Sequence, residues 1–133
     1  MKLLLDTQVF LWMVGGSDRV PEAVRQLLRS PDNEVWLSAI SVWEMAIKQG
    51  RDRLTLPAPA AAYAALQRKR HAIGSLPIEE AAVAHLAKIP DVHRDPFDRV
   101  LVCQAIEHDM TLVSADTLVQ RYPVKVLWSA DAP

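Results

Sequence analysis

The chain has 133 residues, of which 50% are hydrophobic and 23% charged, and its formal net charge at pH 7 is −1. This composition excludes a disordered chain and predicts a single domain, residues 1–133, that can bury an ordinary core. A chain so close to neutral does not bind nucleic acid through bulk charge, so any such contact must come from a local basic patch. Residues 68–71 and the pair Arg51 and Arg53 are candidates, although each is also typical of a solvated helix end.

The cysteine content and the apolar runs predict a cytoplasmic protein without a membrane segment. Cys103 is the single cysteine, so it can form no internal disulfide, and the chain lacks a Cys/His set for zinc. No apolar run approaches the ~20 residues that span a membrane. Asp6 also follows the first apolar residues too soon for a signal peptide. We expect Cys103 to be a buried structural thiol.

Short apolar strands alternate with amphipathic helices along the chain. Residues 2–5 are apolar after Lys2, which predicts a strand buried on both faces, as in a parallel sheet. The later patterns predict strands at 34–38, 72–76, 111 up to the acid at 116, and 124–128. They predict helices at 9–12, 21–29, 41–50, 59–70, 77–88 and from Pro96 onward, and a brief one at 117–121. In the 77–88 helix the expected inward side chains are Ile78, Ala82, Val83 and Leu86. This alternation predicts the α/β class, with a parallel sheet between helical layers.

Residues 93–99, which read His-Arg-Asp-Pro-Phe-Asp-Arg, have the pattern of a helix start. Asp95 offers an N-cap oxygen, and Pro96 suits the first helical position, where its missing N–H costs nothing. Asp98 then lies in the first turn, near the positive end of the helix dipole. By this pattern alone, Asp95 and Asp98 are explained as ordinary features of a helix start.

Glu44 also admits a purely structural interpretation. Ser41 and Glu44 have the spacing of a capping box, in which the two side chains satisfy each other's backbone N–H groups at a helix start. Because this helix follows a predicted strand, the same placement brings Glu44 to the carboxyl edge of the sheet. Lys48 lies one helical turn further on and can pair with it.

Four acids share this kind of position, just after a strand or at the start of a helix: Asp6, Glu44, Asp98 and Asp116. The strands of a parallel sheet end at the same edge, so these carboxylates are expected to converge there. Like charges crowded together need a cation, and oxygen-only ligands suit Mg²⁺ or Mn²⁺. Such a site points to phosphoryl chemistry with metal-activated water. The alternative, a scatter of capping acids, stays open at this point.

Four motifs resemble those of a PIN domain, and more closely those of the VapC-type toxins of bacterial type II toxin–antitoxin systems. They are Leu-Leu-Leu-Asp-Thr at 3–7, Ser-Val-Trp-Glu at 41–44, His-Arg-Asp-Pro-Phe-Asp-Arg at 93–99 and Leu-Val-Ser-Ala-Asp at 112–116. The first motif alone is weak, but the third together with the others is highly specific. The resemblance covers nearly the full length of the chain.

The resemblance implies a three-layer α/β/α sandwich around a central parallel sheet and a Mg²⁺- or Mn²⁺-dependent endoribonuclease. It also implies inhibition by a small cognate antitoxin of the VapB type, whose tail occupies the active site, and usually a homodimer. Carried over by motif, the catalytic and metal-binding acids are Asp6, Glu44, Asp98 and Asp116. Asp95 stands second to Asp98 as the acid of the third motif.

Neighbouring polar residues are secondary candidates. Thr7 and Ser114 are expected to orient carboxylates or water, and Arg99 and Lys48 to contact phosphate or to balance charge. Relatives often carry His where this chain has Gln8. Gln does not titrate near neutral pH, so we assign position 8 no acid–base role.

Other functions fit the residues less well. A haloacid-dehalogenase-type phosphatase needs a second Asp where Gln8 stands, and a receiver domain needs an acidic pair where only Asp6 is present. The alternative from another class is a catalytically inactive PIN-like interaction module whose acids are helix caps. The four tryptophans are expected in the core or at a dimer surface rather than as base-stacking platforms: Trp12, Trp36, Trp43 and Trp128.

Overall fold

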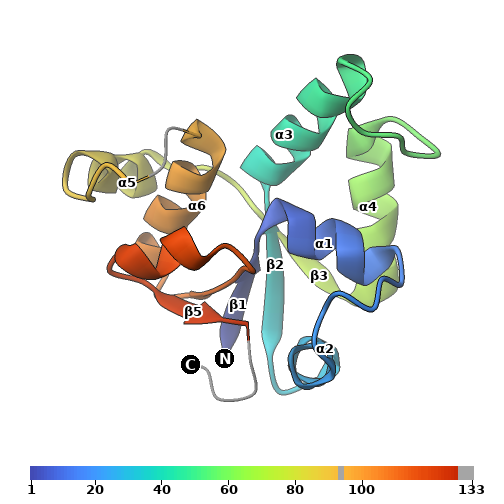
Figure 1. The fold of residues 1–133 in the computed structure, drawn as a ribbon, viewed down its shortest axis with the longest axis horizontal. Helices are drawn as coiled ribbons and strands as arrows, with labels where there is room; N and C mark the ends of the chain where they lie inside the picture. The colour runs from blue at the N-terminus through green and yellow to red at the C-terminus, as the bar shows by residue number, and fades with distance from the viewer. Residues whose placement is uncertain (93–94, 129–133) are drawn as a thin grey trace.

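The computed structural model describes residues 1–92 and 95–128, and within them a five-stranded parallel sheet forms the centre of the molecule (Figure 1). His93 and Arg94 of the third motif lie outside the described residues. The strand order is β3-β2-β1-β4-β5, so β1 is the middle strand. The strands are β1 (Lys2–Leu5), β2 (Glu34–Ser38), β3 (Ile73–Leu76), β4 (Thr111–Val113) and β5 (Lys125–Leu127). The predicted parallel sheet is therefore confirmed.

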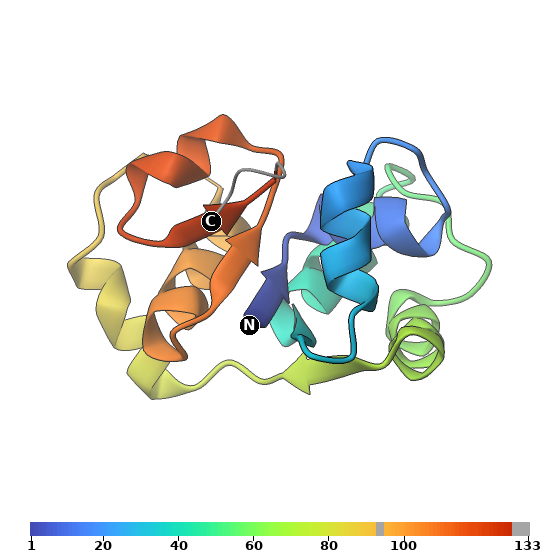
Figure 2. The ribbon, with the colours of Figure 1, turned by 90° about the horizontal axis from the view of Figure 1, so that it is seen from below.

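Helices cover both faces of the sheet, which confirms the three-layer α/β/α architecture (Figures 1 and 2). One layer contains α1 (Thr7–Val14), α2 (Glu22–Arg29), α3 (Ala39–Gly50) and α4 (Ala60–His71). The other contains α5 (Glu80–Val83), the 3₁₀ helix η1 (Ala84–Ala87), α6 (Pro96–Glu107) and the 3₁₀ helix η2 (Thr117–Arg121). No helix in the described part of the chain is both long enough and apolar enough to cross a membrane.

The side-chain alternation of β1 explains why its sequence is wholly apolar after Lys2. Leu3 and Leu5 pack into the core beneath α1 to α4, whereas Leu4 packs into the core beneath α6. All three side chains are fully buried. A middle strand that contributes to two cores has no polar face, and this is the pattern from which the sequence predicts a parallel strand. Cys103 belongs to the core beneath α6, where burial raises the pKa of its free thiol.

The prediction of one amphipathic helix at 77–88 is wrong. Only α5 is α-helical there, η1 follows it as a 3₁₀ turn, and Pro77 and Ile78 precede them without regular structure. Ala82 is buried, as predicted, but three larger side chains expected to point inward are 42% to 48% exposed: Ile78, Val83 and Leu86. A helix of one turn has little stability of its own, so the amphipathic pattern does not extend it, and only the small Ala82 side chain becomes fully buried.

Candidate functional site

The carboxyl edge of the sheet carries two acids directly after neighbouring strands. Asp6 follows β1 and is the N-cap of α1, where its Oδ1 accepts a hydrogen bond of 2.7 Å from the backbone N–H of Gln8. Asp116 comes shortly after β4 and is the N-cap of η2, where its Oδ1 accepts a 2.9 Å bond from the N–H of Leu118. Because β1 and β4 are adjacent parallel strands, both acids reach the same edge.

The start of α6 has the local structure that its sequence predicts. Asp95 is the N-cap, its Oδ1 accepts a 2.9 Å hydrogen bond from the N–H of Phe97, and Pro96 begins the helix. Asp98 lies in the first turn. Asp95 therefore acts as a cap, while the side chains of both acids face the same pocket.

The predicted capping box of Ser41 and Glu44 is wrong, because α3 begins three residues earlier. Ser38, the last residue of β2, is the N-cap, and its hydroxyl accepts a 3.0 Å hydrogen bond from the N–H of Ile40. Ser41 is buried within the helix, where its Oγ accepts a 2.8 Å hydrogen bond from the Thr7 hydroxyl. Glu44 is thus free of any capping role and lies on the side of α3 that faces the other acids.

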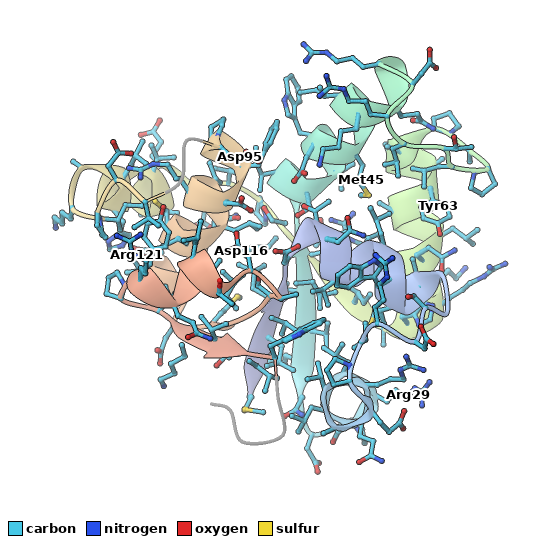
Figure 3. All side chains as sticks on the ribbon, viewed as in Figure 1. Arg29, Met45, Tyr63, Asp95, Asp116 and Arg121 are labelled. Atoms are coloured by element: carbon cyan, nitrogen blue, oxygen red, sulfur yellow. The ribbon has the colours of Figure 1, made fainter. Side chains whose placement is uncertain are left out.

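One pocket of about 360 Å³ brings the predicted acids together. Its described lining consists of Asp6, Thr7, Gln8, Leu11, Glu44, Met45, Lys48, Arg53, Leu54, Asp95, Asp98 and Asp116. The four acids of the candidate metal site and Asp95 therefore share one pocket, although they come from α1, α3, α6 and η2. In Figure 3, Asp95 and Asp116 lie on one side of this region and Met45 on the other.

Burial and the neighbouring charge of Glu44 both change the pKa of Asp6. Burial raises the pKa of Asp6, and the charge of Glu44 raises it further. The opposite influence comes mainly from Ser114, whose hydroxyl donates a 2.8 Å hydrogen bond to Oδ2 of Asp6. Ser114 also accepts a 3.1 Å bond from the N–H of Asp116, so it joins two of the acids. Such a pocket favours any ligand that brings positive charge to the carboxylates.

The basic residues near the pocket have different roles. Lys48 Nζ lies 2.5 Å from Oε2 of Glu44, as its spacing predicts, and balances that carboxylate. Arg99 does not line the pocket; its guanidinium donates to the carbonyl of Pro90 at 3.0 Å and lies 3.5 Å from Asp91. Arg53 does line the pocket; the sequence indicates it, with Arg51, as a candidate basic patch for nucleic-acid contact but not as part of the acidic site. Its place in the site depends on how the loop after α3 folds back, and no local pattern signals that.

The donor set fits a divalent ion that prefers oxygen, because the pocket offers carboxylates, a hydroxyl and an amide but no thiol or imidazole among its described lining. As the side chains stand, no three described His, Cys, Asp or Glu residues are grouped closely enough to hold a metal ion. The acids line the pocket, so a shared ion would require their side chains to move closer together.

The tryptophans divide between the core and the surface. Trp12 and Trp128 contact each other with ring centroids 5.9 Å apart, and both pack partly buried against the core beneath α1 to α4. Trp36 packs partly buried on the opposite side of the sheet. Trp43 is 62% exposed and lines a different pocket. It is therefore not a core residue, which was one of the two locations predicted for it. It also lies outside the acidic pocket.

A family model supplies the decisive comparison: the model for the PIN domain matches residues 3–125, which include the acids described above. The chain belongs to the PIN-domain family. PIN-domain ribonucleases generally use a divalent metal ion, and this fits the oxygen-rich pocket.

Similar proteins agree with this assignment. The PIN domain is 30% identical over 115 residues to Ribonuclease VapC22 of Mycobacterium tuberculosis, and the match covers 86% of each chain. It also resembles a chain of the VapBC2 structure from Rickettsia felis, with a TM-score of 0.72 and 14% identity over 96% of this chain and 98% of that one. A chain of DNA-bound VapBC from Salmonella typhimurium gives a TM-score of 0.67 with 17% identity over 97% and 99%. At these identities the two structures establish the fold.

Proposed function

We propose that this PIN domain is an endoribonuclease that requires Mg²⁺ or Mn²⁺ and is the toxin of a toxin–antitoxin pair. The observation that carries the proposal is the convergence of four predicted acids, from four segments of the chain and both helical layers, on one pocket of a PIN domain. Capping alone does not explain this convergence, because Glu44 caps nothing. The likeness to a protein named Ribonuclease VapC22 supports RNA as the substrate.

The proposed metal ligands are the acids that line the pocket: Asp6, Glu44, Asp98 and Asp116, with Asp95 as a further candidate. When bound, the ion supplies Lewis-acid stabilisation of the phosphodiester and activation of water. Ser114 holds Asp6 in place through its hydrogen bond, and Lys48 balances the charge of Glu44. Arg53 stands at the pocket and contributes positive charge toward the RNA phosphate.

We also propose that a VapB-type antitoxin binds this chain, since the solved structures that it resembles are toxin–antitoxin complexes. We also propose a homodimer, which the resemblance of the sequence motifs to VapC-type toxins implies, and the exposed Trp43 is then a candidate for its surface. A cytoplasmic location follows from the proposed substrate, because the RNA and the antitoxin are both present there.

The first test is Mn²⁺ binding to the antitoxin-free protein by calorimetry. Asp6→Asn and Asp98→Asn each remove one proposed ligand without changing the shape of the side chain, and we expect both to abolish specific binding. Asp18→Asn removes the same charge at an exposed position outside the pocket and should bind like the wild type. If folded wild-type protein binds no Mn²⁺, the non-catalytic interaction module becomes the better explanation.

Cleavage is tested second, with a mixture of cellular RNAs in the presence and absence of EDTA. We expect cleavage by the wild type that EDTA stops, and none by Asp6→Asn or Asp98→Asn. Cleavage at the normal rate by either variant would show that the proposed acids are not the site.

A further inference from the structure

A second pocket lies at the opposite edge of the sheet, among the amino ends of the strands. It measures about 590 Å³ and is larger than the acidic pocket, with which it shares no described residue. The ends of α2 and α4 lie beside each other there in both ribbon views, and Arg29 marks the place in Figure 3. Its lining comes from the ends of α2 and α4, from the turn after α2 and from the first residues of β2 and β3.

The charge of this pocket has one sign. Three arginines and an imidazole line it, and no Asp or Glu is among its described lining residues. Arg25 stabilises the local backbone, since its Nη2 donates to the carbonyls of Ser17 at 2.6 Å and Val20 at 3.3 Å. Arg29 and Arg70 are exposed and form no ion pair with any described residue. Arg25 also lies 3.9 Å from Oε2 of Glu22, so the unbalanced positive charge of this pocket comes from Arg29 and Arg70.

The helix dipoles explain part of this arrangement. Arg29 lies in the last turn of α2, and Arg70 and His71 lie in the last turn of α4, where cations stabilise a helix. That effect needs each cation near its own helix end, but it does not need side chains of two helices to line one pocket. The shared pocket is therefore the feature that points to a ligand.

The floor of the pocket indicates the kind of ligand. Leu28, Val35 and Ile73 are buried apolar residues that line it, while the arginines stand at its rim. A ligand with an apolar body and an anionic group matches both parts, and the planar guanidinium of arginine binds phosphate through paired hydrogen bonds. A nucleotide unit has this chemistry.

We propose that this pocket binds the phosphate of a nucleotide unit through Arg29 and Arg70. The molecule that carries this phosphate is either a free mononucleotide or an RNA chain. Only the RNA source rests on the proposed ribonuclease function. In that case the pocket holds part of the substrate away from the acidic pocket, and it determines which RNA is bound rather than the chemical step.

The test is a titration of the full-length protein with AMP, inorganic phosphate, hexaglutamate and a single-stranded RNA decamer, followed by NMR of backbone amides and by calorimetry. EDTA is present, so no RNA is cleaved. We expect AMP to shift the amides of Asn33 and Ala72, at the pocket. The double variant Arg29→Gln/Arg70→Gln should bind AMP at least about tenfold more weakly, because two charge-assisted hydrogen bonds are lost. Arg121→Gln/Lys125→Gln removes the same charge from exposed positions outside this pocket and should bind AMP as the wild type does.

The probes distinguish the two sources. Tighter binding of the decamer than of AMP, with a raised KM and unchanged kcat for RNA cleavage by the Arg29→Gln/Arg70→Gln variant, identifies RNA. Equal binding of both probes identifies a free nucleotide. If both double variants lost AMP affinity equally, binding would be due to bulk charge. If no probe shifted the pocket amides, the arginines would serve only the helix dipoles. Either result would overturn the proposal. Tighter binding of hexaglutamate than of AMP at the same amides would overturn it in favour of an acidic peptide. A protein that cleaves no RNA would disprove the proposed function without affecting the AMP result.

Discussion

Ser114 donates a 2.8 Å hydrogen bond to Oδ2 of Asp6 across a separation of 108 residues. The bond joins the residue after β4 to the residue after β1, and it holds one oxygen of Asp6 while the N–H of Gln8 holds the other at 2.7 Å. Both oxygens of the central acid are thus fixed by the protein itself. The parallel pairing of β1 with β4 makes this contact possible.

Ser114→Ala should weaken Mn²⁺ binding by about tenfold, because partners that orient a ligand typically contribute that much to metal affinity. The lost hydrogen bond also lowered the pKa of Asp6, so in the variant that pKa rises further and the pH dependence of Mn²⁺ binding shifts upward. Calorimetry at several pH values measures both effects. Ser75→Ala, at an exposed position on β3 outside the acidic pocket, is the control. An unchanged affinity in Ser114→Ala would mean that Asp6 needs no such support.

Asp6→Asn should leave the metal-free protein as stable as the wild type or more stable. Burial raises the pKa of Asp6, so its charged form costs stability in the folded state at neutral pH, and Asn keeps the N-cap acceptor for Gln8. Since the folded-state pKa lies above the unfolded one, wild-type stability falls as pH rises through the folded-state value. The advantage of the variant is therefore present at pH 7 and disappears as pH falls below the unfolded value.

Thermal unfolding in EDTA between pH 4 and pH 8 measures this dependence for both proteins. Adding Mn²⁺ should reverse the order, because an ion that binds only the folded wild type stabilises only that protein. A large loss of stability in Asp6→Asn at pH 7 would instead assign Asp6 a structural role.

Lys48→Met should destabilise the metal-free protein, because it leaves the buried Glu44 carboxylate without the cation 2.5 Å away. Lys48 is about half exposed, so solvent screening limits the loss to about 1 kcal/mol in the free energy of unfolding. The double variant Glu44→Gln/Lys48→Met should recover most of that loss. Urea unfolding of the two single variants and the double variant gives the coupling between the residues, and a coupling near zero would contradict the role of Lys48 in balancing charge.

Gly74→Ala should destabilise the protein by about 1–3 kcal/mol through steric overlap. Gly74 is paired with Trp36 across β2 and β3, and a Cβ at position 74 would lie 2.5 Å from Cε3 of the Trp36 ring. Gly50→Ala is the matched control, since a Cβ there meets nothing within 4 Å and the protein should gain at most about 0.5–1 kcal/mol, because Gly50 is the last residue of α3. Urea unfolding of both variants should show shifts of opposite sign, and shifts of the same sign would contradict the overlap.

The sequence by itself determined those features that depend on neighbouring residues. The apolar run of β1 specified a strand buried on both faces, because a middle strand has no polar side. Asp95 and Pro96 specified the start of α6, because the cap and the first turn are made within a few residues of each other. The alternation of these elements then implied a parallel sheet, and with it the edge at which the acids meet.

Only the tertiary structure decided which of several equivalent local choices was made. Ser38 and Ser41 are both good caps by sequence. In the structure Ser38 caps the helix, and Ser41 lies inside it, where its hydroxyl accepts a hydrogen bond from Thr7 of another element. The bond between Ser114 and Asp6 and the position of Arg53 likewise depend on contacts between distant segments. An amphipathic pattern records which side chains can be buried, but packing against the rest of the fold decides which of them are.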